Sequence, residues 1–246
     1  MTIIDHLFFL ALAVAYPIAS YISFKRLLRR IAAGQVVGPT EIYKSTLISH
    51  WTLFGMALAI WLATGRSWVA LGFGWEVDTG FLVGLALTAA AIVVMMRQYG
   101  SLDSATEKTR ESLRRQIGDL EFMMPRNNTE LGRFYTVSVT AGIVEETLWR
   151  GYMFWYLGHI MPLWAAAIVT SVVFGFGHIY QGVANVPKIT LIGGVFAGLY
   201  LLTGSLWLPM LLHAVFDAVQ GRAVCRLLSS ASVNPSSAAN SRIRGS

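Results

Sequence analysis

Seven long apolar segments occupy most of this chain. About 20 consecutive apolar residues suffice to cross the hydrocarbon core of a bilayer as a helix, and the shorter segments can be tilted or buried against neighbours. The segments are residues 3–24, 43–64, 81–96, 134–156, 163–179, 189–203 and 206–219. The sequence therefore predicts an all-α fold, a polytopic membrane helix bundle of about seven transmembrane helices plus a cytoplasmic or interfacial helix.

Composition agrees with a membrane setting. Hydrophobic residues make up 55% of the 246 residues and charged residues only 13%, whereas an ordinary globular chain has about 25% charged residues. The 19 Lys and Arg exceed the 13 Asp and Glu, but the basic residues gather beside the apolar segments, as the positive-inside rule expects. The lipid bilayer is thus the predicted partner, and nucleic acid is not.

The positions of the basic residues predict the orientation of the chain. "KRLLRR" follows the first apolar segment, Arg97 the third, and Arg222 and Arg226 the last, while Arg133 precedes the fourth. Placing these ends in the cytoplasm puts the N-terminus outside and the C-terminus inside. We therefore expect a multi-pass protein of the cell membrane.

The chain divides into four predicted parts. Residues 1–100 hold N-terminal transmembrane helices, 101–133 a cytoplasmic polar segment with a solvated helix, 134–221 a membrane core with most of the ionisable residues considered below, and 222–246 a disordered polar tail. Residues 68–80 leave two possibilities open, an amphipathic piece in the membrane interface or a further membrane element.

The fourth, fifth and seventh apolar segments contain ionisable residues. Such groups are expensive at bilayer depth, and they mark functional pathways when they face a bundle interior. The alternative is an interhelical hydrogen-bond network without catalysis. The residues are Glu145, Glu146, Arg150, His178, His213 and Asp217.

Spacing within the helices pairs four of these residues. Glu146 and Arg150 are four apart, as are His213 and Asp217, so each pair shares a helix face. Arg150 can neutralise Glu146, which leaves Glu145 free for proton transfer, and Asp217 can orient the His213 imidazole. At about 1.5 Å per residue, Glu145 lies about 18 Å from Arg133 and His213 about 12 Å from Gly221. His178 lies about 10 Å from the cytoplasmic end of its segment if that segment runs on to Asn185. They can therefore meet in the cytoplasmic half.

Three motifs around these residues resemble a known family. "EETLWR" is similar to its EExxxR motif, "FGFGH" to FxxxH and "HAVFD" to HxxxN/D, in the right order and in separate apolar segments. The family is that of the CAAX prenyl proteases and bacteriocin-processing enzymes (Abi), which are intramembrane glutamate peptidases. The resemblance covers residues 125–221.

The resemblance implies an intramembrane endopeptidase that cuts near a membrane-anchored or prenylated C-terminus. It implies Glu145 as general base for a water, with His178 assisting at that water and His213 with Asp217 contacting the carbonyl or oxyanion. Many members carry asparagine at the position of Asp217, so orienting His213 is the safer role. It further implies a lipidated or hydrophobic peptide substrate, without a metal or other cofactor.

Two other classes of function stay open. A zinc metallopeptidase would use His178, His213 and a carboxylate as ligands, although the sequence has no HExxH. A scaffold, transporter or bacteriocin-immunity protein would use the polar groups without catalysis. We expect no role for His6, His50 and His159, which we place near the ends of apolar segments and without partners in any motif. Gly194 and Gly198 have the spacing of a close helix contact.

Overall fold

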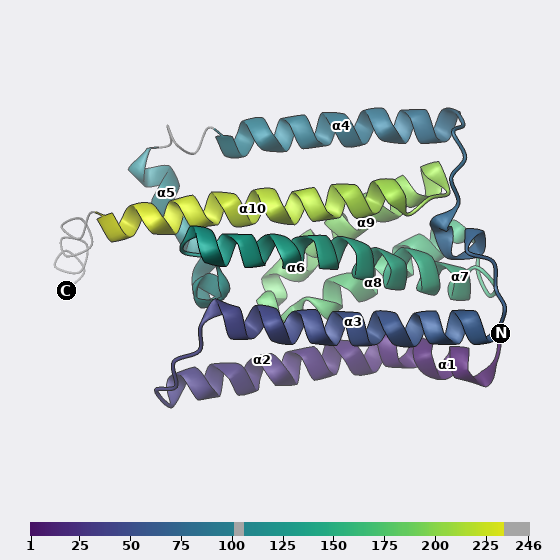
Figure 1. Cartoon of the computed structure of the whole chain (residues 1–246), viewed down its shortest axis with the longest axis horizontal. Coiled ribbons are helices and arrows are strands. Elements are labelled where there is room, and N and C mark those ends of the chain that lie inside the picture. Colours follow the sequence, from purple (N-terminus) through teal and green to yellow (C-terminus); the bar gives the residue numbers. More distant parts are fainter. Residues whose placement is uncertain (101–105, 234–246) are drawn as a thin grey trace.

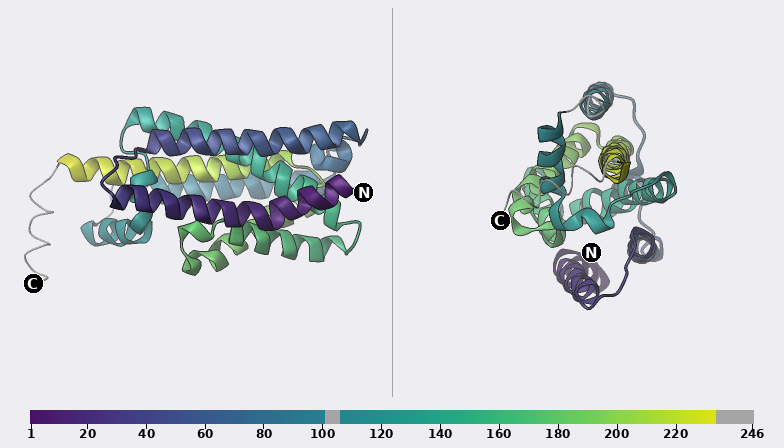
Figure 2. Two further views of the ribbon diagram at one scale, coloured as in Figure 1. Left: turned by 90° about the horizontal axis from the view of Figure 1, so that it is seen from below. Right: turned by 90° about the vertical axis from the view of Figure 1, so that its left-hand side faces the viewer.

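The apolar segments fold as long helices that lie side by side along one axis (Figure 1). The computed structural model describes residues 1–100 and 106–233, and within these it contains helices and turns but no strand. The predicted all-α fold is confirmed. Figure 2 shows the bundle also along its axis, with α4 at one edge, α1 and α2 at the opposite edge, and α10 between them.

The first half of the chain contributes three long helical segments. The first is continuous, because a π-helical stretch, η1, joins α1 to α2. The single turn η2 lies between α3 and α4. The bounds are α1 (Ile3–Leu10), η1 (Ala11–Ala15), α2 (Tyr16–Ala32), α3 (Pro39–Ala63), η2 (Val69–Phe73) and α4 (Thr79–Gly100).

The polar segment and the second half follow. The predicted solvated helix is present as α5, with a 3-10 turn, η4, after it. The bounds are α5 (Glu107–Ile117), η4 (Gly118–Met123), α6 (Asn128–Glu146), η5 (Thr147–Tyr152), α7 (Met153–Leu157), α8 (Leu163–Gly177), η6 (Ile179–Gln181), η7 (Val183–Asn185), α9 (Val186–Thr203) and α10 (Trp207–Val233).

Four of these helical segments are long and apolar enough to cross a membrane by length and composition: Ile3–Ala32, Pro39–Ala63, Thr79–Gly100 and Val183–Thr203. α8 is apolar but shorter, and α6 and α10 carry the ionisable residues in question. Large apolar side chains are exposed along the outer faces of the bundle, which in water would be a severe aggregation liability. The chain is a membrane protein, and the number seven for its transmembrane helices stays a prediction.

Several element ends differ from those expected. α6 begins six residues before the predicted 134, because the Asn127 side chain caps it by accepting a hydrogen bond from the Glu130 backbone N–H at 2.9 Å. α10 runs on to Val233, so residues 222–233, expected in the polar tail, are helical. The rest of that predicted tail, residues 234–246, lies outside the described residues, as do 101–105.

The open question about residues 68–80 is answered by their contacts. They form the turn η2 and the start of α4 rather than a further long helix. The Gly72 carbonyl accepts from the Leu206 N–H at 2.8 Å, and the Gly74 carbonyl accepts from the Ser205 hydroxyl at 2.9 Å. The turn between α9 and α10 is tight, with Gly204 at φ +62°. The segment therefore packs onto that turn.

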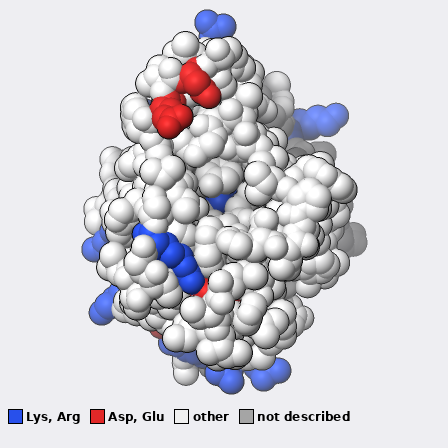
Figure 3. All heavy atoms as spheres, turned by 90° about the vertical axis from the view of Figure 1, so that its right-hand side faces the viewer, with Lys and Arg blue, Asp and Glu red and all other residues white. Residues whose placement is uncertain are grey.

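The two ends of the bundle differ in charge. The end with the α2–α3 loop and α5 carries most of the basic residues identified from the sequence. Figure 3 shows the opposite end, which is mostly uncharged and hollowed near its middle. A cavity of about 340 Å³ opens at this end, lined by Ala70, Phe154, Trp155, Gly158, His159, Leu163, Tyr200, Leu201 and Gly204. None of the six predicted site residues lines it.

Candidate active site

The two consecutive glutamates end α6, and the π-helical turn η5 follows them directly. Such turns occur frequently at functional sites, because they shift the helix register locally. The two carboxylates point to different neighbours. Glu145 contacts α3, whereas Glu146 contacts α10 and the arginine of its own helical segment. Their divergence agrees with the rotation of about 100° per residue in a helix.

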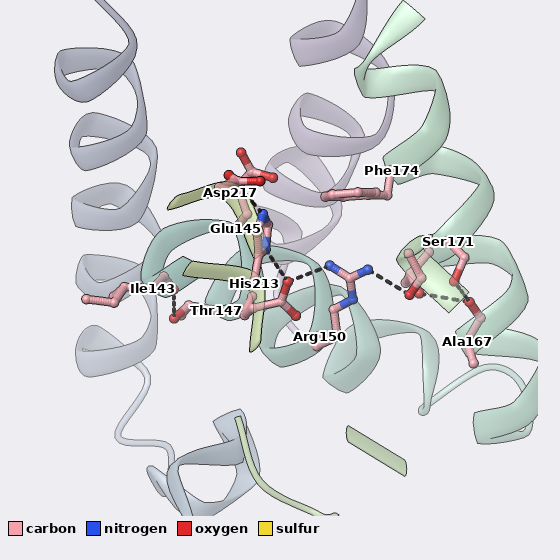
Figure 4. Close-up of polar contacts among 12 residues, drawn as sticks. Ile143, Glu145, Thr147, Arg150, Ala167, Ser171, Phe174, His213 and Asp217 are labelled. Atoms are coloured by element: carbon pink, nitrogen blue, oxygen red, sulfur yellow. Dashed lines mark hydrogen bonds and ion pairs between the residues drawn. The ribbon is translucent and has the colours of Figure 1, made fainter. Parts of the chain in front are cut away.

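Glu146 is the centre of a buried charge network. Its Oε1 accepts from Arg150 Nη1 at 3.0 Å and lies 2.7 Å from His213 Nδ1, and the Glu146 and Arg150 side chains are fully buried. The predicted pairing of Glu146 with Arg150 is therefore present. Arg150 also donates to the Gly193 carbonyl on α9 at 2.8 Å. The dashed contacts in Figure 4 follow this network from His213 to Arg150 and beyond.

Aromatic rings cover this network. The Arg150 guanidinium lies 4.6 Å from the centre of the Phe174 ring, and the His213 ring stacks on Phe196 with 4.9 Å between ring centres and 11° between planes. Cation–π contacts of this kind are strongest where water is excluded. The rings therefore pack against the Arg150 guanidinium and the His213 imidazole and help to bury the network.

Glu145 lies in a different environment. Its Oε1 is 2.9 Å from His50 Nε2, and its side chain is 13% exposed. Its Oε2 is buried and has no hydrogen-bond partner in the part of the chain that the structure describes. A small cavity of about 10 Å³ adjoins the pair and is lined by Leu12, Tyr16, His50, Leu53, Glu145, Leu148 and Trp149. That volume is about what one water molecule requires.

His213 is held from both sides. Its Nδ1 contacts Glu146 at 2.7 Å, and its Nε2 lies 3.7 Å from Asp217 Oδ2. The first distance is that of a hydrogen bond, and the second is that of an ion pair without one. Glu146 thus makes the closer contact with the ring that Asp217 was expected to orient. Asp217 is the more accessible carboxylate, with 30% of its side chain exposed.

His178 follows the last residue of α8. Its Nδ1 is 2.9 Å from the Phe174 carbonyl, and because a carbonyl only accepts, Nδ1 carries the proton and Nε2 is the nitrogen left for other contacts. His178 does not line the small cavity beside Glu145. His50 and Glu145 line this cavity together, and the meeting of His178 with Glu145 at a water stays a prediction.

The sequence interpretation missed His50. We expected it near the end of an apolar segment and without a partner, and both expectations are wrong: it lies inside α3, is 7% exposed and contacts Glu145. The signal that could have found it is the one that found Glu145, an ionisable residue in the interior of an apolar helix. The other two histidines contact Tyr156 (His6) and the Trp155 carbonyl (His159), outside the motifs.

Glycines bring the helices of the site together, but not the pair expected. A Cβ at Gly142 would lie 2.6 Å from the Met210 carbonyl oxygen on α10, and one at Gly193 would lie 3.2 Å from the Phe174 ring. Gly198 has nothing within 4 Å of such a Cβ, and Gly194 has only the Ser171 hydroxyl at 4.0 Å. Gly142, one turn before Glu146, is what lets α6 approach α10 closely enough for the glutamate to reach His213.

No group of three His, Cys, Asp or Glu side chains among residues 1–100 and 106–233 is arranged to hold a metal ion. His213 already bonds to Glu146, and His178 bonds to a backbone carbonyl. The arrangement can instead place a carboxylate oxygen beside a single water, with two imidazoles and a further carboxylate close by.

Comparisons with known proteins agree with the family resemblance of the three motifs. Residues 127–219 match the model of a family described as type II CAAX prenyl endopeptidase Rce1-like, which confirms the resemblance found in the sequence. A protein of Escherichia coli, called an uncharacterized 24.3 kDa protein, is 26% identical over 172 residues, covering 67% of this chain and 74% of that protein. No solved structure matches. The matched segment supports a CAAX-type protease activity within the membrane.

Proposed function

We propose that this protein is an intramembrane endopeptidase that hydrolyses a peptide bond near a membrane-anchored or prenylated C-terminus, with Glu145 activating the water. The observation that carries the proposal is that Glu145 has an unpaired, buried Oε2 and that the same residue lines a cavity of about one water volume. A general base must lie within hydrogen-bond distance of the proton that it removes. We propose that a water in this cavity donates that proton to Oε2.

The proposed reaction begins with that water. Glu145 Oε2 takes a proton from it as its oxygen attacks the scissile carbonyl carbon, which gives a tetrahedral intermediate with a negatively charged oxygen. The proton then passes to the leaving amine as the C–N bond breaks. Hydrogen-bond donors placed at the developing oxyanion supply much of the stabilisation in such reactions.

His178 and His213 are the proposed groups at the oxyanion and the water. The Nδ1 atoms of the two rings face the Phe174 carbonyl and the Glu146 carboxylate, so Nδ1 carries the first proton of each ring and Nε2 is without a hydrogen bond among the described contacts. Each Nε2 therefore donates to an oxyanion when its ring is an imidazolium and accepts from the water when its ring is neutral. Asp217 lies 3.7 Å from His213 Nε2, which supports a role in holding the imidazole and its charge. Glu146, itself paired with Arg150, holds the His213 ring in position through its hydrogen bond to Nδ1.

We also propose a place and an orientation for this activity. The protein lies in the cell membrane as a multi-pass protein, with its active site open to the cytoplasmic half. The clustering of basic residues at the α2–α3 end of the bundle supports this orientation. A lipidated substrate would then enter from the inner leaflet with its peptide near Glu145.

The test is cleavage of a panel of peptides by the purified, reconstituted protein. The panel contains farnesylated and geranylgeranylated CAAX peptides, their unlipidated forms and hydrophobic peptides without the motif. We expect cleavage of lipidated peptides, and a fall of about 10²- to 10⁴-fold in the Glu145→Gln variant, which removes the base and keeps the shape. Glu41→Gln, at a surface ion pair, is the control.

Three outcomes contradict the proposal. A fully active Glu145→Gln variant removes the residue from the mechanism. Loss of activity after chelation, with recovery on adding zinc, favours a metallopeptidase, because activity without a metal should survive chelation. A folded wild-type protein that cleaves no member of the panel favours a scaffold, transporter or immunity role.

A further inference from the structure

His50 is an ionisable side chain that contacts Glu145 from a helix outside the segment matched to the family. It is on α3, 95 residues before Glu145 in the chain, and only 8% of its side chain is exposed. It lines the same small cavity as Glu145. None of the three motifs contains it.

The partners of the His50 ring determine how many protons the pair holds. Nδ1 is 3.0 Å from the Thr46 carbonyl and Nε2 is 2.9 Å from the Glu145 carboxylate. A carbonyl only accepts, so Nδ1 carries a proton. The contact to Glu145 then contains one proton, either on Nε2 of an imidazolium facing a carboxylate or on Glu145 facing a neutral ring. In both states the histidine holds Oε1.

The two oxygens of Glu145 therefore have different tasks. Oε1 bonds to His50, and Oε2 remains without a partner within the described chain, on a side chain that lines the cavity. A carboxylate on a flexible side chain would otherwise rotate, and misplacement by about 1 Å can cost about 100-fold in rate. Fixing one oxygen directs the other toward the water.

We propose that His50 is a positioning residue for the water-activating carboxylate, so that the working unit is a His50–Glu145 pair between α3 and α6. This inference rests on the proposed function. The Nε2–Oε1 hydrogen bond persists while Oε2 takes the proton from water, because that proton arrives at the other oxygen. The N-terminal half of the protein thus contributes directly to the site, instead of only surrounding it.

The experiment compares two amides at position 50. His50→Gln places an amide nitrogen where Nε2 stands and can still donate to Glu145, whereas His50→Asn reaches only as far as Nδ1 and cannot. We expect His50→Asn to lower kcat by about 10- to 100-fold at unchanged KM, the effect of losing a hydrogen bond to a charged group. We expect His50→Gln to keep most of the activity.

The control is His159→Gln. His159 makes the same bond to the carbonyl four residues before it, at 2.7 Å from Trp155, but it has no carboxylate partner among the described contacts and is exposed. It should have no effect on kcat. The unfolding temperature of each variant is measured, and the cleavage assays are run at a temperature at which all variants are folded.

Equal activity of the Gln and Asn variants, whether both high or both low, overturns the inference, because a purely structural role does not distinguish the two nitrogens. A change confined to KM also overturns it. Glu145→Gln in the same assay separates the two proposals. If that variant is inactive while His50→Asn is fully active, only the inference about His50 fails; if Glu145→Gln is active, the proposed function fails.

Discussion

Glu145 and Glu146 are adjacent in the chain, yet their carboxylates bind histidines on helices from opposite halves of the protein, His50 on α3 and His213 on α10. Adjacent helical residues point about 100° apart, so α6 contacts both α3 and α10 through side chains at the same depth. The buried Glu146 also neutralises Arg150. In the proposed mechanism, Glu146 therefore has a structural role and Glu145 activates the water.

The first prediction concerns the buried ion pair. Glu146→Gln leaves Arg150 buried without a negative partner, and breaking such a pair costs about 3–5 kcal/mol. We expect lower expression, a lower unfolding temperature and lower activity together. Glu41→Gln is the matched control, because its pair with Arg30 is about half exposed and surface pairs are worth about 0–1 kcal/mol. Equal unfolding temperatures for the two variants would contradict the structural role of Glu146.

The second prediction uses two glycines of α6. Gly142→Ala places a Cβ 2.6 Å from the Met210 carbonyl oxygen, whereas Gly132→Ala meets nothing within 4 Å. Alanine gains up to about 1 kcal/mol over glycine in a helix interior, so Gly132→Ala should raise the unfolding temperature slightly. Gly142→Ala should lower it and reduce cleavage, because α6 must move away from α10. If both substitutions stabilise the protein, the close approach of the two helices is not as described.

The third prediction concerns Asp217. Asp217→Asn keeps an acceptor for His213 and should retain most of the activity. Asp217→Ala removes the contact and should lower kcat/KM by about 10- to 100-fold, the usual effect of losing an interaction with a charged group. Steady-state cleavage of the best lipidated peptide measures both. An equal loss in the two variants would mean that the negative charge itself is needed.

The fourth prediction is the orientation. A reporter fused after Arg30 should read as cytoplasmic, because "KRLLRR" ends the first long helical segment at the basic end of the bundle. A reporter fused between α3 and α4, after Gly65, should read as external. The opposite pattern would invert the protein and place the site in the other leaflet.

The features that could be predicted from the sequence are those that depend on the geometry of a single helix. Segment lengths predict the helical bundle, and the spacing of four predicts the contact of Glu146 with Arg150, because both follow from helix geometry alone. The start of α6 was placed too late because the prediction relied on hydropathy. Its first turns are polar and capped by Asn127, so hydropathy does not mark them.

Contacts between helices were beyond local patterns. The partner of His50 is decided by how α3 and α6 are rotated against each other, and no spacing within either helix gives that angle. The same limit explains why Gly193 and Gly142, instead of Gly194 and Gly198, lie at the close approaches. His50 was also placed near a segment end because its segment was taken to begin at residue 43, whereas α3 begins at Pro39.

The order of the partners along the chain has a consequence for biogenesis. Arg150 and Glu146 lie on one continuous helical segment, so they can neutralise each other while that segment enters the bilayer and before α9 and α10 have been synthesised. Unpaired charges would be costly at that stage. Glu145 meets His50 on α3, a helix made earlier. Glu145 and Glu146 thus both have a partner when α6 enters the bilayer. The helix α10 is made later and completes the site around a segment that is already inserted.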